Sequence, residues 1–108
     1  MPETMTREEI KDALQKGTLT LVEALPEKYY NDGHLPGAVQ INHDEIEAKA
    51  DTLLPDKDAL IVTYCTGESC PNSGYAADHL IRKGYTNVRK YAGGKEDWTE
   101  GGEALEVV

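Results

Sequence analysis

The chain has 108 residues and a formal net charge of −9. This length is typical of one domain with a single core, so we expect residues 1–108 to form one domain. The acidic balance argues against nucleic acid and anionic membrane surfaces as partners, because both bind clustered Lys and Arg. The longest apolar stretch is far shorter than the roughly 20 residues of a membrane span, and the charged N-terminus lacks a secretory core. We therefore expect a cytoplasmic protein.

The first predicted element is a helix that begins after Thr6. Thr6 and Glu9 have the spacing of a capping box, in which each side chain accepts a hydrogen bond from the backbone of the other. Apolar residues then recur at helical spacing, and Gly17 follows as a helix terminator.

The rest of the chain alternates between predicted strands and helices. Strands are predicted at 18–25, 38–42, 59–65 and 87–91. Helical segments are predicted at 26–33, from an Asp44 cap to about 51, at 71–83, and from Lys95 onward. The tail after 100 is expected to form a last strand or an ordered extension. This alternation predicts a three-layer α/β fold, in which helices flank a mostly parallel central sheet.

Cys65 lies where the most apolar predicted strand, 59–65, meets the loop before a helix. In open α/β sheets, ligands bind beyond the carboxyl ends of the strands. A loop that enters a helix can direct several backbone N–H groups at one point and hold an anion there. We expect donors from Thr66, Gly67, Ser69 and Asn72, with Gly67 at positive φ, to lower the pKa of the Cys65 thiol. The location suits a nucleophile, although a cysteine that ends a strand can also serve only as a small apolar residue.

Cys70, the only other cysteine, has three possible roles. It is a resolving thiol for Cys65, a loop residue without chemistry, or a metal ligand. The metal role is the weakest, because the spacing is unusual for zinc and no histidine stands at a companion position. A disulfide across so short a loop requires Cα atoms within about 7 Å.

Three ordered blocks of the sequence resemble the single-domain rhodanese family of sulfurtransferases. They are 21–42 with the Gly-His-Leu-Pro-Gly-Ala signature at 33–38, 61–70 with the cysteine loop, and 84–102 with Gly93-Gly94 and Trp98. The resemblance implies a parallel sheet of about five strands. It also implies that Cys65 takes a sulfane sulfur from a donor, holds it as a persulfide and passes it to a thiol or to cyanide, without a metal or organic cofactor.

The loop also departs from the family pattern. Where the family often has Asp-x-Arg, this chain has Glu23 and Leu25, and the loop contains Glu68 but no Arg or Lys. A carboxylate beside the sulfur should repel the thiosulfate dianion by about 1 kcal/mol at partial exposure. Polysulfide is therefore an alternative donor, and a protein is a possible sulfur acceptor. The C-x-G-x-x-C spacing is similar to that of a rhodanese subgroup with a second loop cysteine, which keeps redox chemistry open.

We also predict which residues around Cys65 bind the substrate. The substrate cradle comprises Thr66, Gly67, Glu68, Ser69 and Cys70, and Lys95 is a possible anion contact. The sequence argues against phosphatase chemistry, because that chemistry requires an Arg at the end of the cysteine loop, and no Arg lies between Cys65 and Arg82. The competing hypothesis is a module that binds a partner or senses redox state through Cys65 and Cys70.

Overall fold

The computed structural model of the protein describes residues 3–107, and its centre is a parallel sheet of five strands. The strands are β1 (Glu3–Thr4), β2 (Leu19–Glu23), β3 (Val39–Gln40), β4 (Leu60–Tyr64) and β5 (Val88–Tyr91). The helices are α1 (Arg7–Lys16), α2 (Glu27–Asp32), α3 (Ile46–Leu53), α4 (Asn72–Arg82) and α5 (Gly94–Glu100). The sheet order is β1-β5-β4-β2-β3, and every pairing is parallel. The predicted α/β fold is confirmed.

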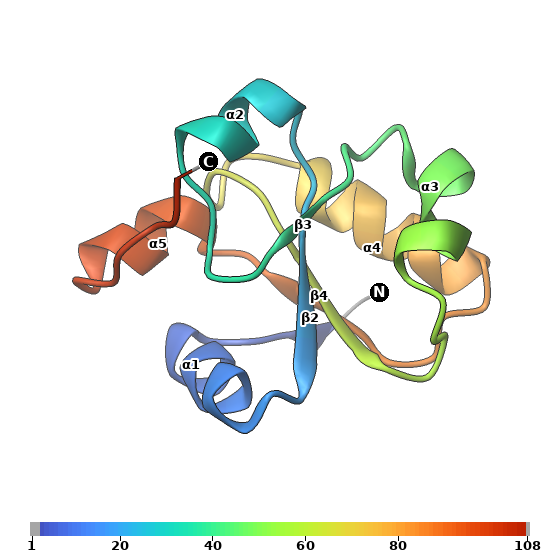
Figure 1. Ribbon diagram of the computed structural model, residues 1–108, viewed down its shortest axis with the longest axis horizontal. Coiled ribbons are helices and arrows are strands. Elements are labelled where there is room, and N and C mark those ends of the chain that lie inside the picture. The colour runs from blue at the N-terminus through green and yellow to red at the C-terminus, as the bar shows by residue number, and fades with distance from the viewer. Residues whose placement is uncertain (1–2, 108) are drawn as a thin grey trace.

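Both faces of the sheet are covered, which is why β4 is apolar along nearly its whole length. Successive β4 residues point to opposite faces: Ile61 packs with residues of α3 and α4, and Val62 and Tyr64 pack with residues of α1 and α5. Figure 1 shows these two helix pairs on either side of the strands. Because β4 pairs with β2 on one side and β5 on the other, its carboxyl end is surrounded by loops from both neighbours.

The first helix has the ends that the sequence predicts. The Thr6 N–H donates to Glu9 Oε1 at 2.9 Å, and the Glu9 N–H donates to Thr6 Oγ1 at 3.2 Å. Gly17 ends the helix in the left-handed conformation, with φ 67°. These contacts satisfy backbone groups that a helix end would otherwise leave unpaired.

The expected start of α3 is corrected. Asp44 does not cap α3: the helix begins at Ile46, and Glu45 precedes it without a side-chain cap. Instead, the Asn42 side chain accepts from the His43 N–H at 3.0 Å, and the Asn42 carbonyl accepts from the Glu45 N–H at 2.8 Å. This turn occupies the position at which Asp44 was expected to start the helix.

The two chain ends also add structure to the fold. The two-residue strand β1, absent from the prediction, pairs with β5 at the sheet edge. The tail is an extension that forms an isolated antiparallel bridge between Glu106 and His34. In the described part of the chain, no helix combines the length and apolar character needed to cross a membrane.

Candidate active site

Cys65 directly follows β4 and is 1% exposed. The loop 66–71 then connects it to α4. The Thr63 hydroxyl donates to the Ser73 carbonyl at 2.8 Å, so the end of β4 is tied to the first turn of α4. This contact places the first turn of an 11-residue helix beside the cysteine. The predicted location of Cys65 at the carboxyl edge of the sheet is correct.

The start of α5 holds the backbone of the cysteine loop. The Lys95 N–H donates to the Cys65 carbonyl at 3.1 Å, and the Glu96 N–H donates to the Thr66 carbonyl at 2.9 Å. Gly94 lies directly against this site, because a Cβ atom there would overlap the Cys65 carbonyl oxygen. Gly94 has φ 59°, whereas Gly67 is not at positive φ, so the expectation about Gly67 was wrong. The glycine that the loop requires belongs to the neighbouring helix, which approaches too closely for a side chain.

The N–H groups of the loop are left available by this arrangement. Each peptide unit is planar, so a carbonyl that points toward α5 directs the following N–H group away from α5. The carbonyls of Cys65 and Thr66 point toward α5, so the N–H groups of Thr66 and Gly67 point away from it. Within residues 3–107, none of the N–H groups of residues 66–69 donates a hydrogen bond. Free N–H groups in succession form a concavity that accepts an anion.

The Cys65 thiol is buried and lies close to Cys70 and Ser73. Its Sγ donates to the Cys70 carbonyl at 3.2 Å. Burial and the Cys70 thiol raise the pKa of Cys65, while the Ser73 backbone N–H and hydroxyl act in the opposite direction. The expected lowering of this pKa is therefore wrong: the loss of hydration outweighs the donors. Both cysteines are free thiols, and Cys70 is half-buried.

Lys95 does not face the cysteine loop as a free cation. Its Nζ lies 3.0 Å from Glu23 Oε2 and donates to the Tyr29 carbonyl at 2.8 Å, and its side chain is 14% exposed. The lysine is therefore occupied by a carboxylate and a carbonyl beneath the surface. The hypothesis that Lys95 contacts an anionic substrate or offsets Glu68 is not supported by these contacts.

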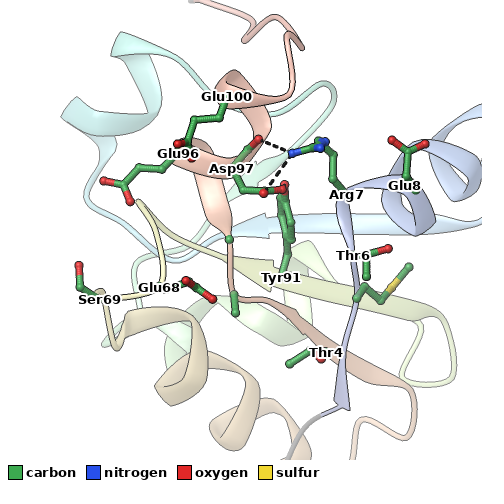
Figure 2. A pocket seen from close by; sticks show the side chains of 13 residues that line it. Thr4, Thr6, Arg7, Glu8, Glu68, Ser69, Tyr91, Glu96, Asp97 and Glu100 are labelled. Carbon is green, nitrogen blue, oxygen red and sulfur yellow. Dashed lines mark hydrogen bonds and ion pairs between the residues drawn. The ribbon is translucent and has the colours of Figure 1, made fainter.

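Glu68 and Ser69 are exposed and line a groove of about 770 Å³ between the cysteine loop, the N-terminal segment and α5. Figure 2 shows Glu68 on one side of this groove and Glu8 on the other. The carboxylates along it belong to Glu8, Glu68, Glu96, Asp97 and Glu100. The only cation among the lining residues, Arg7, lies 3.0 Å from Asp97 Oδ1. The surface beside the cysteine loop is therefore acidic.

The three histidines lie outside the cysteine loop. His34 is buried, and its Nδ1 lies 2.9 Å from the Tyr30 carbonyl. His79 of α4 contacts Glu47 of α3 at 2.9 Å. His43 lies against the exposed Tyr75, with ring centroids 6.0 Å apart. Within the described chain, no three His, Cys, Asp or Glu side chains gather as a metal site.

Two residues beside Cys65 were missed by the sequence reasoning. Ser73, whose backbone N–H and hydroxyl act against the raised pKa of Cys65, had one signal in the sequence: its place in the first turn of the helix after a candidate nucleophile. Glu96 lies over Gly67, where a Cβ atom would overlap its carboxylate. Nothing in the local sequence indicated this contact, because it joins the cysteine loop to α5, which is distant along the chain.

Comparison with known proteins gives consistent matches. The Rhodanese-like domain family model matches residues 6–101. The chain is 31% identical over 96 residues to the HTH-type transcriptional regulator Rv0324 of Mycobacterium tuberculosis, covering 89% of this chain and 41% of that protein. It is 36% identical over 73 residues to the thiosulfate sulfurtransferase PspE of Escherichia coli, covering 68% of this chain and 66% of that protein.

Solved structures agree with the sequence matches. The human single-domain sulfurtransferase TSTD1 is 25% identical, with a TM-score of 0.78 over 93% of this chain and 97% of that one. The BH2092 protein of Bacillus halodurans is 24% identical, with a TM-score of 0.89 over 97% of this chain and 77% of that one, and shows the fold alone. The chain thus spans 41% of the regulator and 66% of PspE. With a family match that runs from α1 to the end of α5, the protein belongs to the rhodanese-like domain family.

Proposed function

We propose that the protein is a rhodanese-type sulfurtransferase in which Cys65 carries sulfane sulfur as a persulfide. The observation that carries this proposal is the combination of a buried cysteine at the end of β4 with a following loop whose N–H groups are free. A persulfide anion needs hydrogen-bond donors, and we infer that the loop N–H groups take this role.

The reaction is a double displacement. The Cys65 thiolate attacks the outer sulfur of the donor, a Cys65–S–S⁻ group forms, and the rest of the donor leaves with the electron pair of the broken S–S bond. With thiosulfate as donor, the leaving group is sulfite. An acceptor thiolate or cyanide then attacks the outer sulfur of the persulfide, and the Cys65 thiolate returns. The electrons balance within each exchange, so neither step requires a metal or an organic cofactor.

The charges around the loop favour a hydropolysulfide monoanion or a neutral organic polysulfide over the thiosulfate dianion as donor. Glu68 and Glu96 lie at the loop, and the nearby Lys95 is paired with Glu23. Two carboxylates without a free cation raise the energy of a dianion more than that of a singly charged or neutral sulfur chain. The same acidic groove suits an acceptor thiol on a protein whose contact surface is basic.

The test is the intact mass of the protein after incubation with thiosulfate and, separately, with polysulfide, under non-reducing conditions. Wild type is compared with Cys65→Ser and Cys70→Ser. We expect a gain of one sulfur atom that Cys65→Ser abolishes and excess thiol reverses. If the folded, reduced wild type gains no sulfur from either donor, the proposal is wrong.

The second candidate function is a redox-sensing or partner-binding module. Its support is the proximity of the two thiols: Cys65 Sγ donates to the Cys70 carbonyl at 3.2 Å, and the Cys70 thiol acts on the pKa of Cys65. Oxidation would join the two sulfurs in an intramolecular disulfide, with two protons and two electrons passing to an oxidant such as a peroxide. A matched relative is a transcriptional regulator, which is consistent with such a role.

The two functions are separated by thiol counting. Mild peroxide treatment should remove both thiols within one monomer and be reversed by dithiothreitol if a disulfide switch operates. A sulfurtransferase without a switch should instead retain the Cys70 thiol after peroxide treatment and accept sulfur at Cys65 once reduced.

A further inference from the structure

A fully buried carboxylate lies below the cysteine loop and takes no part in the proposed reaction. Glu23, the last residue of β2, is 0% exposed. The Tyr64 hydroxyl donates to its Oε1 at 2.7 Å, and Lys95 Nζ lies 3.0 Å from its Oε2. Among the described residues, Oε2 has no hydrogen-bond partner beyond this ion pair. Burying a carboxylate and an ammonium group costs desolvation free energy, which their mutual attraction offsets only in part.

Stability is a weak explanation for such a pair. Replacing a buried ion pair with apolar residues of similar volume is often neutral or stabilising, because both charges lose their hydration. A role in fixing the geometry of a neighbouring segment is the better-supported use of buried polar groups.

Both partners of Glu23 adjoin Cys65. Tyr64 immediately precedes Cys65 in the chain, and its hydroxyl also accepts the Leu35 N–H at 3.0 Å. Lys95 donates its own backbone N–H to the Cys65 carbonyl at 3.1 Å. The Glu23 carboxylate thus contacts Tyr64, the residue before Cys65, through Oε1. Through Oε2 it contacts Lys95, whose backbone N–H donates to the Cys65 carbonyl.

The hydrogen bond from the Lys95 N–H to the Cys65 carbonyl determines the direction of the loop N–H groups. Its side chain is anchored at Glu23 and at the Tyr29 carbonyl, which fixes the first turn of α5 relative to β2 and α2. The carbonyls of Cys65 and Thr66 point toward that turn, so the N–H groups of the next two residues point away from it. If α5 shifted, these N–H groups would turn with the peptide planes.

We propose that Glu23 and Lys95 are a positioning pair, which holds the backbone of Cys65 and Thr66 so that the loop N–H groups are aligned for the persulfide. This inference rests on the proposed sulfurtransferase function, and it gives Lys95 a role different from contact with substrate. Neither residue touches the reacting sulfur. The groups that face Glu23 are Lys95 from α5, Tyr64 from β4, and His34 and Tyr30 from the segment around α2.

The first experiment measures single-turnover loading of Cys65 by inorganic polysulfide, using intact mass, for Lys95→Met and Lys95→Arg. We expect Lys95→Met to lower the loading rate at saturating polysulfide by about tenfold or more, since small misplacements of a reacting group cost this much. The half-saturating polysulfide concentration should change much less. Lys95→Arg, which keeps the charge, should restore most of the rate.

The matched control is Lys83→Met. Lys83 is similarly covered, with a side chain 12% exposed and Nζ 3.6 Å from Glu47 Oε1, but it lies at the opposite end of α4 from Cys65. This variant should leave the loading rate within about twofold of wild type, as expected for a change away from the site. Equal losses in Lys83→Met and Lys95→Met would overturn the proposal.

The double variant Glu23→Gln, Lys95→Met separates positioning from stability. It removes both charges, so the cost of an unpaired buried carboxylate disappears and the melting temperature should recover relative to Lys95→Met. The loading rate should stay low, because the anchor of α5 is still missing. Wild-type loading in the double variant would overturn the proposal, and this variant carries the test if Lys95→Met alone does not fold.

A second measurement, alkylation of Cys65 by iodoacetamide, distinguishes failure of the positioning role from failure of the proposed sulfurtransferase function. If wild type gains no sulfur, the pH dependence of Cys65 alkylation by iodoacetamide still reports the alignment of the N–H groups. A positioning pair predicts that Lys95→Met moves the alkylation midpoint to higher pH, whereas Lys83→Met leaves it unchanged. An unchanged midpoint in Lys95→Met would sink the inference whatever the protein's activity is.

Discussion

The Cys65 thiol donates to the backbone carbonyl of Cys70 at 3.2 Å, and the Cys70 thiol contributes to the raised pKa of Cys65. The reactive sulfur therefore has a second thiol as its neighbour within a single short loop. The resting state that this arrangement favours is the neutral Cys65 thiol, since burial and Cys70 both raise the pKa.

Cys70→Ala should lower the pKa of Cys65. The substitution keeps the Cys70 carbonyl as acceptor and removes only the thiol, which is one cause of the raised pKa. A lower pKa places more thiolate at neutral pH, so iodoacetamide should alkylate Cys65 faster at pH 7 and the midpoint of the pH profile should move down. Peptide masses assign the alkylated residue in wild type. A midpoint that stays or rises in Cys70→Ala would contradict this prediction.

Ser73→Ala should have the opposite effect. The Ser73 hydroxyl stabilises the thiolate, so its removal should move the alkylation midpoint of Cys65 to higher pH. Sulfur loading by polysulfide should slow at neutral pH and recover as the pH is raised, because the thiolate is the attacking form. Thr52→Ala, at an exposed position in α3, is the control and should leave the midpoint in place.

Gly94→Ala and Gly67→Ala should differ in their cost to stability. At Gly94, φ 59° costs an alanine about 1–2 kcal/mol, and the Cβ would also overlap the Cys65 carbonyl, which cannot move freely. At Gly67, the Cβ would meet only the end of the Glu96 side chain, which can swing into solvent. Urea unfolding should therefore show a loss of more than about 1 kcal/mol for Gly94→Ala and a smaller loss for Gly67→Ala. Similar free energies of unfolding would show that α5 does not press on the loop.

Glu68→Lys should increase loading by thiosulfate. The change replaces a repelling charge with an attracting one at the cysteine loop, so loading at low ionic strength should rise several-fold and the gain should fall as salt is added. Loading by a neutral organic trisulfide should stay nearly constant. Glu8→Lys makes the same change in net charge on the far side of the groove (Figure 2) and should have a smaller effect. Equal gains in the two variants would show that net charge alone is responsible.

The parts of the fold that follow local rules could be predicted from the sequence. The capping box of Thr6 and Glu9 and the left-handed Gly17 are local features, and the apolar run of β4 directly indicates a covered strand. The strand β1 could not be predicted, because its two residues are exposed and only their pairing with β5 defines it. The start of α3 was misplaced, since a turn between Asn42 and Glu45 delays the helix to Ile46 and no side chain caps it.

The candidate site was predictable in position but not in detail. The location of Cys65 follows from the end of an apolar strand before a helix. Its raised pKa depends on how deeply the loop is buried, which no local pattern specifies. Lys95 was assigned to substrate because its partner, Glu23, is distant along the chain and comes close only through the pairing of β2 with β4 and β4 with β5.

The contact between α5 and the cysteine loop also provides an optical signal. The chain has one tryptophan, Trp98, which lies in α5 just beyond the residues that hold the Cys65 and Thr66 carbonyls. It is 2% exposed, its Nε1 donates to the Ala104 carbonyl, and its ring packs edge-on against Tyr91. Any movement of the loop that displaces α5 changes the surroundings of this indole. Intrinsic fluorescence can therefore follow events at Cys65 in real time, without a label and without a coupled assay.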